Sequence, residues 1–261
     1  MMSDPVVLRR VTCCFSFPRV MWFDQFFDKT FVIALPERRA HIEEVMQKLE
    51  LEPTYFEATM ALTLSRSELQ RKGLVAAGCR LALPQIACAL SHNAVLQTFL
   101  DSPLSTAFVF EDDITPLSLP LLAEAREAVF DTMDNVPPDW DIVNFGRCWD
   151  DCQAGRFSSA VPAGGHGGVL KSYKALCRHA YAVTRRGARK LIDCTTPLDG
   201  RMQSDELIAE QAQLGRLNMY VPPRAVFWQD RDVLGSTLGN NFKQQECARV
   251  PPGGAFFVPG L

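Results

Sequence analysis

The sequence lacks an apolar run long enough to cross a membrane, and neither sign of charge predominates. No uninterrupted stretch reaches the ~18 apolar residues of a transmembrane helix. Twenty-seven basic and thirty acidic side chains give a net charge of −3, and neither kind is gathered in a long run. We therefore expect no nucleic-acid partner. No small-residue cleavage site follows the short apolar stretch after Arg9 and Arg10, so we expect no cleaved signal and a cytoplasmic location.

Glycine and proline are too scarce for a disordered or collagen-like chain, at 16 and 17 of 261 residues. Hydrophobic residues make up 47% of the sequence, and a chain of this length can bury roughly 70–75% of its surface. Its core therefore needs neither disulfides nor metal. We expect one folded domain over residues 31–238, with an irregular leader at 1–30 and an irregular tail at 239–261.

The nine cysteines do not form the pattern of a small disulfide-rich secreted protein, because their number is odd and the chain is long. Reduced thiols are the expectation. Zinc is a weaker alternative, because the candidate ligands contain no C-x2-C pair. Those candidates are Cys148, Cys152, His166, Cys177 and His179.

Short apolar runs alternate along the chain with segments of helical periodicity. This alternation predicts a three-layer α/β fold in which ligands bind beyond the carboxyl ends of the strands. The expected strands are 31–35, 55–56, 107–110, 141–145, 179–183, 217–220 and 225–228, and the expected helices are 42–49, 65–72, 84–99, 118–130, 185–194 and 204–214.

A glycine-rich stretch at 163–168 interrupts this pattern, within a region that shows no periodicity from 146 to 168. It contains neither the GK[ST] of a P-loop nor a G-x-G-x-x-G after a strand, so it is not a phosphate-binding loop by motif. A flexible lid over a site and a simple surface loop are both open interpretations.

Three consecutive acids, Glu111, Asp112 and Asp113, follow the apolar strand at 107–110. Carboxylates this close repel one another, so a positive partner is expected. Side chains alternate along an extended backbone, which lets Glu111 and Asp113 point to one side and Asp112 to the other. Two carboxylates suit Mg²⁺ or Mn²⁺. The alternative is stabilisation by the dipole of the following helix.

Two further pairs lie where they could contact a ligand. Arg38 and Arg39 follow the first strand, where guanidinium groups could bind a diphosphate, although a solvated pair at a helix start fits equally. Ser91 and His92 lie on a mostly apolar helix, and this composition favours a hydrogen-bonded core histidine over a ligand-binding one.

Asp199, Asp205 and Glu206 lie in or beside the helix expected at 204–214. Acids at a helix start are usually caps. Asp205 is also a candidate general base.

Taken in order, five segments resemble glycosyltransferase family 25, which contains lipopolysaccharide-biosynthesis glycosyltransferases and collagen galactosyltransferases. The resemblance extends over roughly 31–238, because Asp205, Gln229 and Ser236 also fall where the family has an aspartate and a glutamine-to-serine stretch. The five segments are 31–39, 87–92, 108–113, 138–146 and 179–191.

The resemblance implies a GT-A-like nucleotide-sugar-binding fold and transfer of a hexose to a hydroxyl of a glycan or protein. The donor would most often be UDP-galactose, with inversion at the anomeric carbon. Glu111 and Asp113 would hold Mn²⁺ or Mg²⁺, and Asp205 would be the catalytic base, with Asp199 and Glu206 as substitutes. The implied substrate-binding residues are Arg38, Arg39, Ser91, His92, Asp112 and Gln229.

Departures from the family pattern keep a second interpretation open. Ala34 and Ala87 replace an asparagine and a glycine, and no alanine-x-aspartate-glycine turn is visible near 58–61. A catalytically inactive protein that binds nucleotide sugars, or a scaffold that retains the fold, is therefore the alternative. A glycoside hydrolase is less favoured, because adjacent acids on one strand end are poorly placed to flank a sugar.

Overall fold

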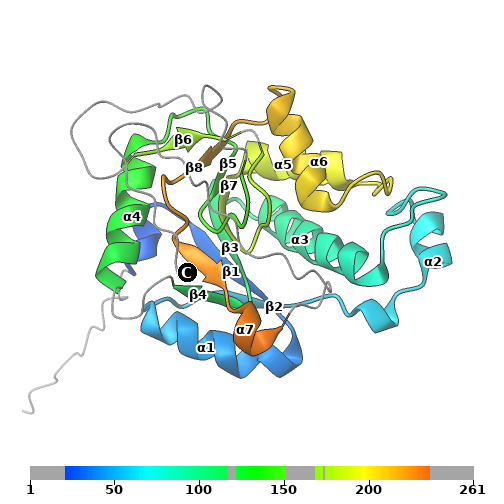
Figure 1. The fold of residues 1–261 in the computed structure, drawn as a ribbon, viewed down its shortest axis with the longest axis horizontal. Helices are drawn as coiled ribbons and strands as arrows, with labels where there is room; N and C mark the ends of the chain where they lie inside the picture. Colours follow the sequence, from blue (N-terminus) through cyan, green and yellow to red (C-terminus); the bar gives the residue numbers. More distant parts are fainter. Residues whose placement is uncertain (1–20, 117–121, 151–167, 173, 236–261) are drawn as a thin grey trace, which may run out of the picture.

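A central sheet of seven strands organises the chain in the computed structural model, which describes residues 21–116, 122–150, 168–172 and 174–235 (Figure 1). The strand order is β2-β1-β3-β7-β5-β8-β6. The strands are β1 (Lys29–Ala34), β2 (Thr54–Glu57), β3 (Thr106–Glu111), β5 (Ile142–Asn144), β6 (Leu170–Lys171), β7 (Ala180–Thr184) and β8 (Met219–Val221). The fold is therefore α/β, with helices flanking a mixed sheet.

Strand direction changes within this sheet. β1 runs parallel to β2 and β3, and β5 runs parallel to β8, whereas β7 lies antiparallel between β3 and β5. Phe110 pairs with Ala180, and the Glu111 amide donates to the His179 carbonyl at 2.8 Å. Residues that precede β7 therefore lie beside the acids that end β3.

Helices cover both faces of the sheet, which confirms the expected three layers (Figure 1). Helices α1 and α4 pack on one face, and α3, α5 and α6 on the other. The described helices are α1 (Arg39–Lys48), α2 (Arg66–Arg71), α3 (Leu83–Asp101), α4 (Leu122–Asn135), α5 (Arg185–Thr195), α6 (Ser204–Gln213) and α7 (Arg231–Leu234), with 3-10 turns η1 (Trp22–Gln25), η2 (Pro36–Arg38) and η3 (Ala61–Thr63).

The alternation of side chains along β3 divides the interior between these faces. Phe108 and Phe110 point into the core under α1 and α4, whereas Ala107 and Val109 point into the core under α3 and α5. The Phe108 and Phe110 rings are 4.4 Å apart between centroids. Full burial of each such ring stabilises the fold by about 1.5–3 kcal/mol, so β3 is firmly fixed between the layers.

Helix α5 is anchored to the start of β5. The Thr184 hydroxyl accepts from the Gly187 amide at the helix start. The buried Asp141 carboxylate accepts from Arg186 Nε and Lys190 Nζ, each at 2.6 Å. A Cβ on Gly187 would lie 2.0 Å from the Asp141 carbonyl oxygen, so only glycine permits this approach.

All the expected strands and helices are present, with boundaries shifted by a few residues. The sequence did not indicate β4 (Ile114–Pro116), β6 or α7, and β4 forms a separate ladder with β9 (Phe227–Gln229). Two predicted segments lie outside the described residues. They are 118–121, the expected start of the helix observed as α4, and 163–167 of the glycine-rich stretch. No described helix combines the length and the apolar character needed to span a bilayer.

The expectation of reduced thiols is wrong for one pair, because Cys148 and Cys177 form a disulfide with their Cα atoms 5.7 Å apart. Their sulfur atoms are therefore unavailable as thiolate ligands for the zinc site considered from the sequence. Cys152 and His166 of that set lie outside the described residues. Among the described cysteines, Cys79, Cys88 and Cys194 are free thiols.

Candidate functional site

The three acids at the end of β3 form a corner in which two carboxylates approach one amide. Gln229 Nε2 lies 3.3 Å from Glu111 Oε2 and 3.1 Å from Asp113 Oδ2. Asp112 turns elsewhere, and its Oδ2 accepts from the Leu35 amide at 2.6 Å. Glu111 and Asp113 thus point to one side and Asp112 to the other, as the alternation of side chains along a strand predicts. We call the cluster of Glu111, Asp112 and Asp113 the acid corner.

Arg38 links the acid corner to the C-terminal end of α7. Its Nη1 donates to Asp112 Oδ1 at 3.2 Å and lies 3.7 Å from Asp113 Oδ2, while its Nη2 donates to the Leu234 carbonyl at 3.0 Å. Arg39 lies away from this cluster. Its guanidinium pairs with Glu43 on the surface and stacks 3.5 Å from the centre of the Tyr55 ring.

His92 connects helix α3 to the acid corner. Its Nε2 lies 2.9 Å from Glu111 Oε1, and its Nδ1 lies 3.1 Å from the Tyr181 hydroxyl. The neighbouring Ser91 has a different set of partners. Its hydroxyl accepts from the Thr59 amide and donates to the Ala87 carbonyl. Ser91 therefore holds the chain after β2, whereas His92 faces the acids.

Burial and mutual repulsion hold protons in the acid corner. Burial, followed by the charge of Asp112, raises the pKa of Glu111 to about 7. Burial, followed by the charges of Glu111 and Asp112, raises the pKa of Asp113 to about 7. Ionising both groups at neutral pH would therefore require added positive charge. Two convergent carboxylates are the oxygen donors that Mn²⁺ and Mg²⁺ prefer, so the residues fit such an ion.

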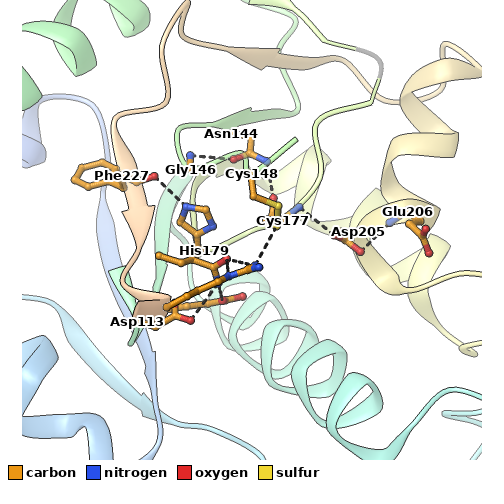
Figure 2. Close-up of a disulfide and its surroundings, with 12 residues drawn as sticks. Asp113, Asn144, Gly146, Cys148, Cys177, His179, Asp205, Glu206 and Phe227 are labelled. Carbon is orange, nitrogen blue, oxygen red and sulfur yellow. Dashed lines mark hydrogen bonds between the residues drawn. A yellow bond between two sulfur atoms is a disulfide. The ribbon is translucent and has the colours of Figure 1, made fainter. Parts of the chain in front are cut away.

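Asp205 lies at the start of α6 and points toward the backbone of Cys177, as Figure 2 shows. Its Oδ2 accepts from the Cys177 amide, and its Oδ1 accepts from the Glu206 amide, both at 3.0 Å. Its negative charge contributes to the raised pKa of Glu111. Asp205 is therefore electrostatically coupled to the acid corner.

The two acids proposed as substitutes for Asp205 have structural partners. Glu206 Oε2 accepts from the Gln203 amide at 2.8 Å, which caps α6. Asp199 pairs with Arg201 on the surface. Burial opposes the charge of Asp199, yet the hydrogen bonds from Arg201 leave its pKa below the ordinary range.

Sequence reasoning missed Arg178, which is 5% exposed. Its Nη2 donates to Ser204 Oγ at 2.8 Å, while its buried Nη1 has no hydrogen-bond partner. The charge of Arg178 lowers the pKa of Glu111, against the dominant effect of burial. Arg178 precedes β7, and only the antiparallel direction of β7 brings it to this end of the sheet. The sequence pattern predicts the strand but not its direction, so it carried no such signal.

Arg231, also missed, orients the glutamine of the acid corner. Its Nη2 donates to Gln229 Oε1 at 2.6 Å, which leaves the Gln229 amide nitrogen directed at Glu111 and Asp113. Near it, the disulfide of Cys148 and Cys177 joins the segments after β5 and before β7 (Figure 2).

Comparison with known proteins places this site in a family context. The family described as "Glycosyltransferase family 25 (LPS biosynthesis protein)" matches residues 27–208. "Inactive glycosyltransferase 25 family member 3" of Mus musculus is 26% identical over 216 residues, covering 77% of this chain and 34% of the mouse protein. The Homo sapiens protein of that name is 25% identical over 193 residues, covering 70% and 31%.

A solved structure titled "Crystal Structure of A197 from STIV" covers 74% of this chain and 81% of its own, with 11% identity and a TM-score of 0.36, and this likeness is too loose to support an argument. The chain spans about a third of the length of the curated relatives it matches. The family match covers more than half of the chain and confirms the resemblance found in the ordered sequence segments. The chain belongs to glycosyltransferase family 25.

Proposed function

We propose that the chain transfers a hexose, most simply galactose from UDP-galactose, to a hydroxyl group of a glycan or protein, with inversion and with a GT-A-like use of a divalent cation. The observation that carries the proposal is the approach of the half-buried Glu111 and the buried Asp113 carboxylates to one amide. Family membership supports a sugar donor and an acceptor.

Glu111 and Asp113 would hold Mn²⁺ or Mg²⁺. When bound, the ion would neutralise charge on the donor diphosphate and on the departing UDP. Arg38 keeps Asp112 turned toward Leu35 and supplies positive charge beside Asp113. Arg178 Nη1, buried and without a partner, would donate to a phosphate oxygen, because an unsatisfied buried guanidinium gains from an anion.

Asp205 is the proposed base that takes the proton of the acceptor hydroxyl. Backbone amides hold both of its oxygens, which fixes the carboxylate at the start of α6. Glu206 and Asp199 are less suited to this role, because one caps the helix and the other pairs with Arg201.

A second candidate function is binding of a nucleotide sugar without transfer. The Arg38 guanidinium already supplies positive charge to the acid corner, 3.2 Å from Asp112 and 3.7 Å from Asp113. The relatives from mouse and human are named inactive. The replacements at Ala34 and Ala87 also favour this alternative.

The test is release of UDP from nucleotide sugars, beginning with UDP-galactose, with and without Mn²⁺, because it needs no acceptor. We expect Asp113→Asn to lower metal-dependent release by roughly 100-fold or more, as loss of a key charge-stabilising group does. The control is Glu44→Gln, which alters a surface acid paired with Lys48. Equal release by wild type and Asp113→Asn would refute the metal role. A melting-temperature shift with UDP and Mn²⁺, without turnover, would support the binding alternative.

A further inference from the structure

Three potential ligands of different chemistry meet on the α3 side of the acid corner. Cys88 and His92 lie four residues apart on α3, which places them on one face of the helix, and Glu111 ends β3. One ligand atom from each, a sulfur, an imidazole nitrogen and a carboxylate oxygen, lies within 4.8 Å of the others. From this geometry we propose that Cys88, His92 and Glu111 form a binding site for Zn²⁺.

The donor set separates this site from the magnesium or manganese site proposed above. Thiolate and imidazole are ligands that Zn²⁺ accepts readily, whereas Mg²⁺ and Mn²⁺ prefer oxygen. Three protein ligands leave one position of a tetrahedral zinc ion open for water or another ligand. The half-buried Cys88 leaves the site partly accessible, while His92 is buried.

The ligand atoms need only small movements to take up a zinc ion. Zinc bonds of about 2.0–2.3 Å place tetrahedral ligands of this kind roughly 3.3–3.6 Å apart. His92 Nε2 and Glu111 Oε1 are 2.9 Å apart, so they would separate by a few tenths of an ångström. The sulfur would approach from a separation of at most 4.8 Å, which a change of side-chain rotamer allows.

Tyr181 orients His92 as a ligand requires. Its hydroxyl lies 3.1 Å from His92 Nδ1 on the side of the ring opposite Nε2. An Nδ1–H group that donates to this hydroxyl leaves the Nε2 lone pair directed at the metal, which is the usual arrangement of metal-binding histidines. Burial also lowers the pKa of His92, so the imidazole is neutral and can act as a ligand.

The charges of the three ligands balance those of the ion. One thiolate, one carboxylate and one neutral imidazole carry a total of two negative charges, which a divalent ion cancels within a partly buried cluster. Without metal, burial and then the Glu111 charge raise the pKa of the Cys88 thiol. Zinc binding therefore releases the thiol proton to solvent. Arg178, Asp205 and Asp113 are the other charged groups that act on Cys88.

Glu111 belongs to both the zinc site and the acid corner, and its two oxygens have different neighbours. Its Oε1 lies beside His92, and its Oε2 lies beside Gln229. The inference goes beyond sugar transfer, because zinc binding requires no nucleotide sugar. A failure of either proposal leaves a separate signature, since donor hydrolysis reports on one and a thiolate–metal bond on the other.

Cobalt titration of the full chain tests the site, because Co²⁺ takes zinc ligands and a Co²⁺–thiolate bond gives a charge-transfer band in the near ultraviolet. We expect one equivalent of Co²⁺ to produce the band and Zn²⁺ to remove it. Cys88→Ser should abolish the band. The matched controls Cys79→Ser and Cys194→Ser, which alter the other described free thiols, should retain it. A band that persists in Cys88→Ser, or no band in wild type, would overturn the proposal.

A measurement on the wild-type protein avoids reliance on a folded variant. One equivalent of Zn²⁺ should slow alkylation of Cys88 at least tenfold, as followed by mass spectrometry of the tryptic peptides. Cys194, which is also half-buried, is the internal control and should react at an unchanged rate. Alkylation of Cys88 at the same rate with and without zinc would count decisively against the site.

Discussion

The metal-free protein is expected to lose stability as the pH rises toward 7, because of the acid corner. Folding raises the pKa of Glu111 from an ordinary 4.5, and that of Asp113 from 3.8, to about 7 in each case. The folded state therefore binds protons more tightly than the unfolded chain. The resulting stability is fully present below about pH 4 and is lost as the pH rises through 7.

The change in the free energy of unfolding can be calculated from one proton that the folded state binds and the unfolded chain does not. Each pH unit over which the folded state holds one extra proton changes the free energy of unfolding by about 1.4 kcal/mol. Counting a single proton shared by Glu111 and Asp113, which is half lost at pH 7, the loss between about pH 5 and 7 is about 2 kcal/mol. A chain of this size would then melt about 4–8 °C lower at the higher pH.

The assay compares melting curves of wild type with those of the double variant Glu111→Gln/Asp113→Asn across this pH range, with chelator present. The variant keeps both side-chain shapes but cannot titrate. The comparison is essential, because burial lowers the pKa of His92 and of His179, the latter to about 4. These neutral histidines make stability rise with pH, in the opposite direction, and they are present in both proteins.

Saturating Mn²⁺ adds a second arm to this experiment. An ion that keeps both carboxylates ionised removes the proton uptake, so the wild-type profile should lose its downward slope relative to the variant. Parallel profiles of wild type and variant in chelator would refute the reasoning. They would show that the two acids titrate normally despite their burial.

Two further predictions concern packing and the paired arginines. Gly187→Ala should cost about 3 kcal/mol in urea unfolding, since its Cβ would meet the Asp141 carbonyl oxygen, whereas Arg189→Ala, at an exposed position of the same helix, should change little. An unaffected Gly187→Ala would mean that α5 shifts freely. Arg38→Ala should also cost about 3 kcal/mol, because it leaves the mostly buried Asp112 carboxylate without a positive partner, while Arg39→Ala should cost below about 0.5 kcal/mol. Equal effects at positions 38 and 39 would contradict the difference in their burial.

Much of the fold could be predicted from the sequence because its signals are local. The apolar run that ends at Glu111 marks β3, helical spacing marks α1, and a proline at the first turn marks α3, so the three layers followed. The clustering of Glu111 and Asp113 depends only on strand alternation, which is equally local. Strand direction is different, because a run buried on both faces has the same pattern whichever way it points.

The missed parts depend on contacts between distant segments. β6 has two residues and pairs with β8, and such short strands carry little pattern of their own. Arg178 reaches the acid corner only because β7 is antiparallel to β3. The two arginines after β1 have the same local sequence context, yet Arg38 contacts the acids and Arg39 faces solvent, since the 3-10 turn η2 precedes α1 there.

Because Cys148 and Cys177 form a disulfide, the redox conditions under which the protein is prepared decide whether this cross-link is present. The Cys177 amide holds Asp205, and its carbonyl accepts from the Asn144 side chain at 2.7 Å. A preparation made under reducing conditions thus lacks one covalent restraint on the residue that orients the proposed base. Batches that differ in the oxidation of this pair therefore differ in how firmly Asp205 is held, and a thiol titration of each batch would reveal the difference.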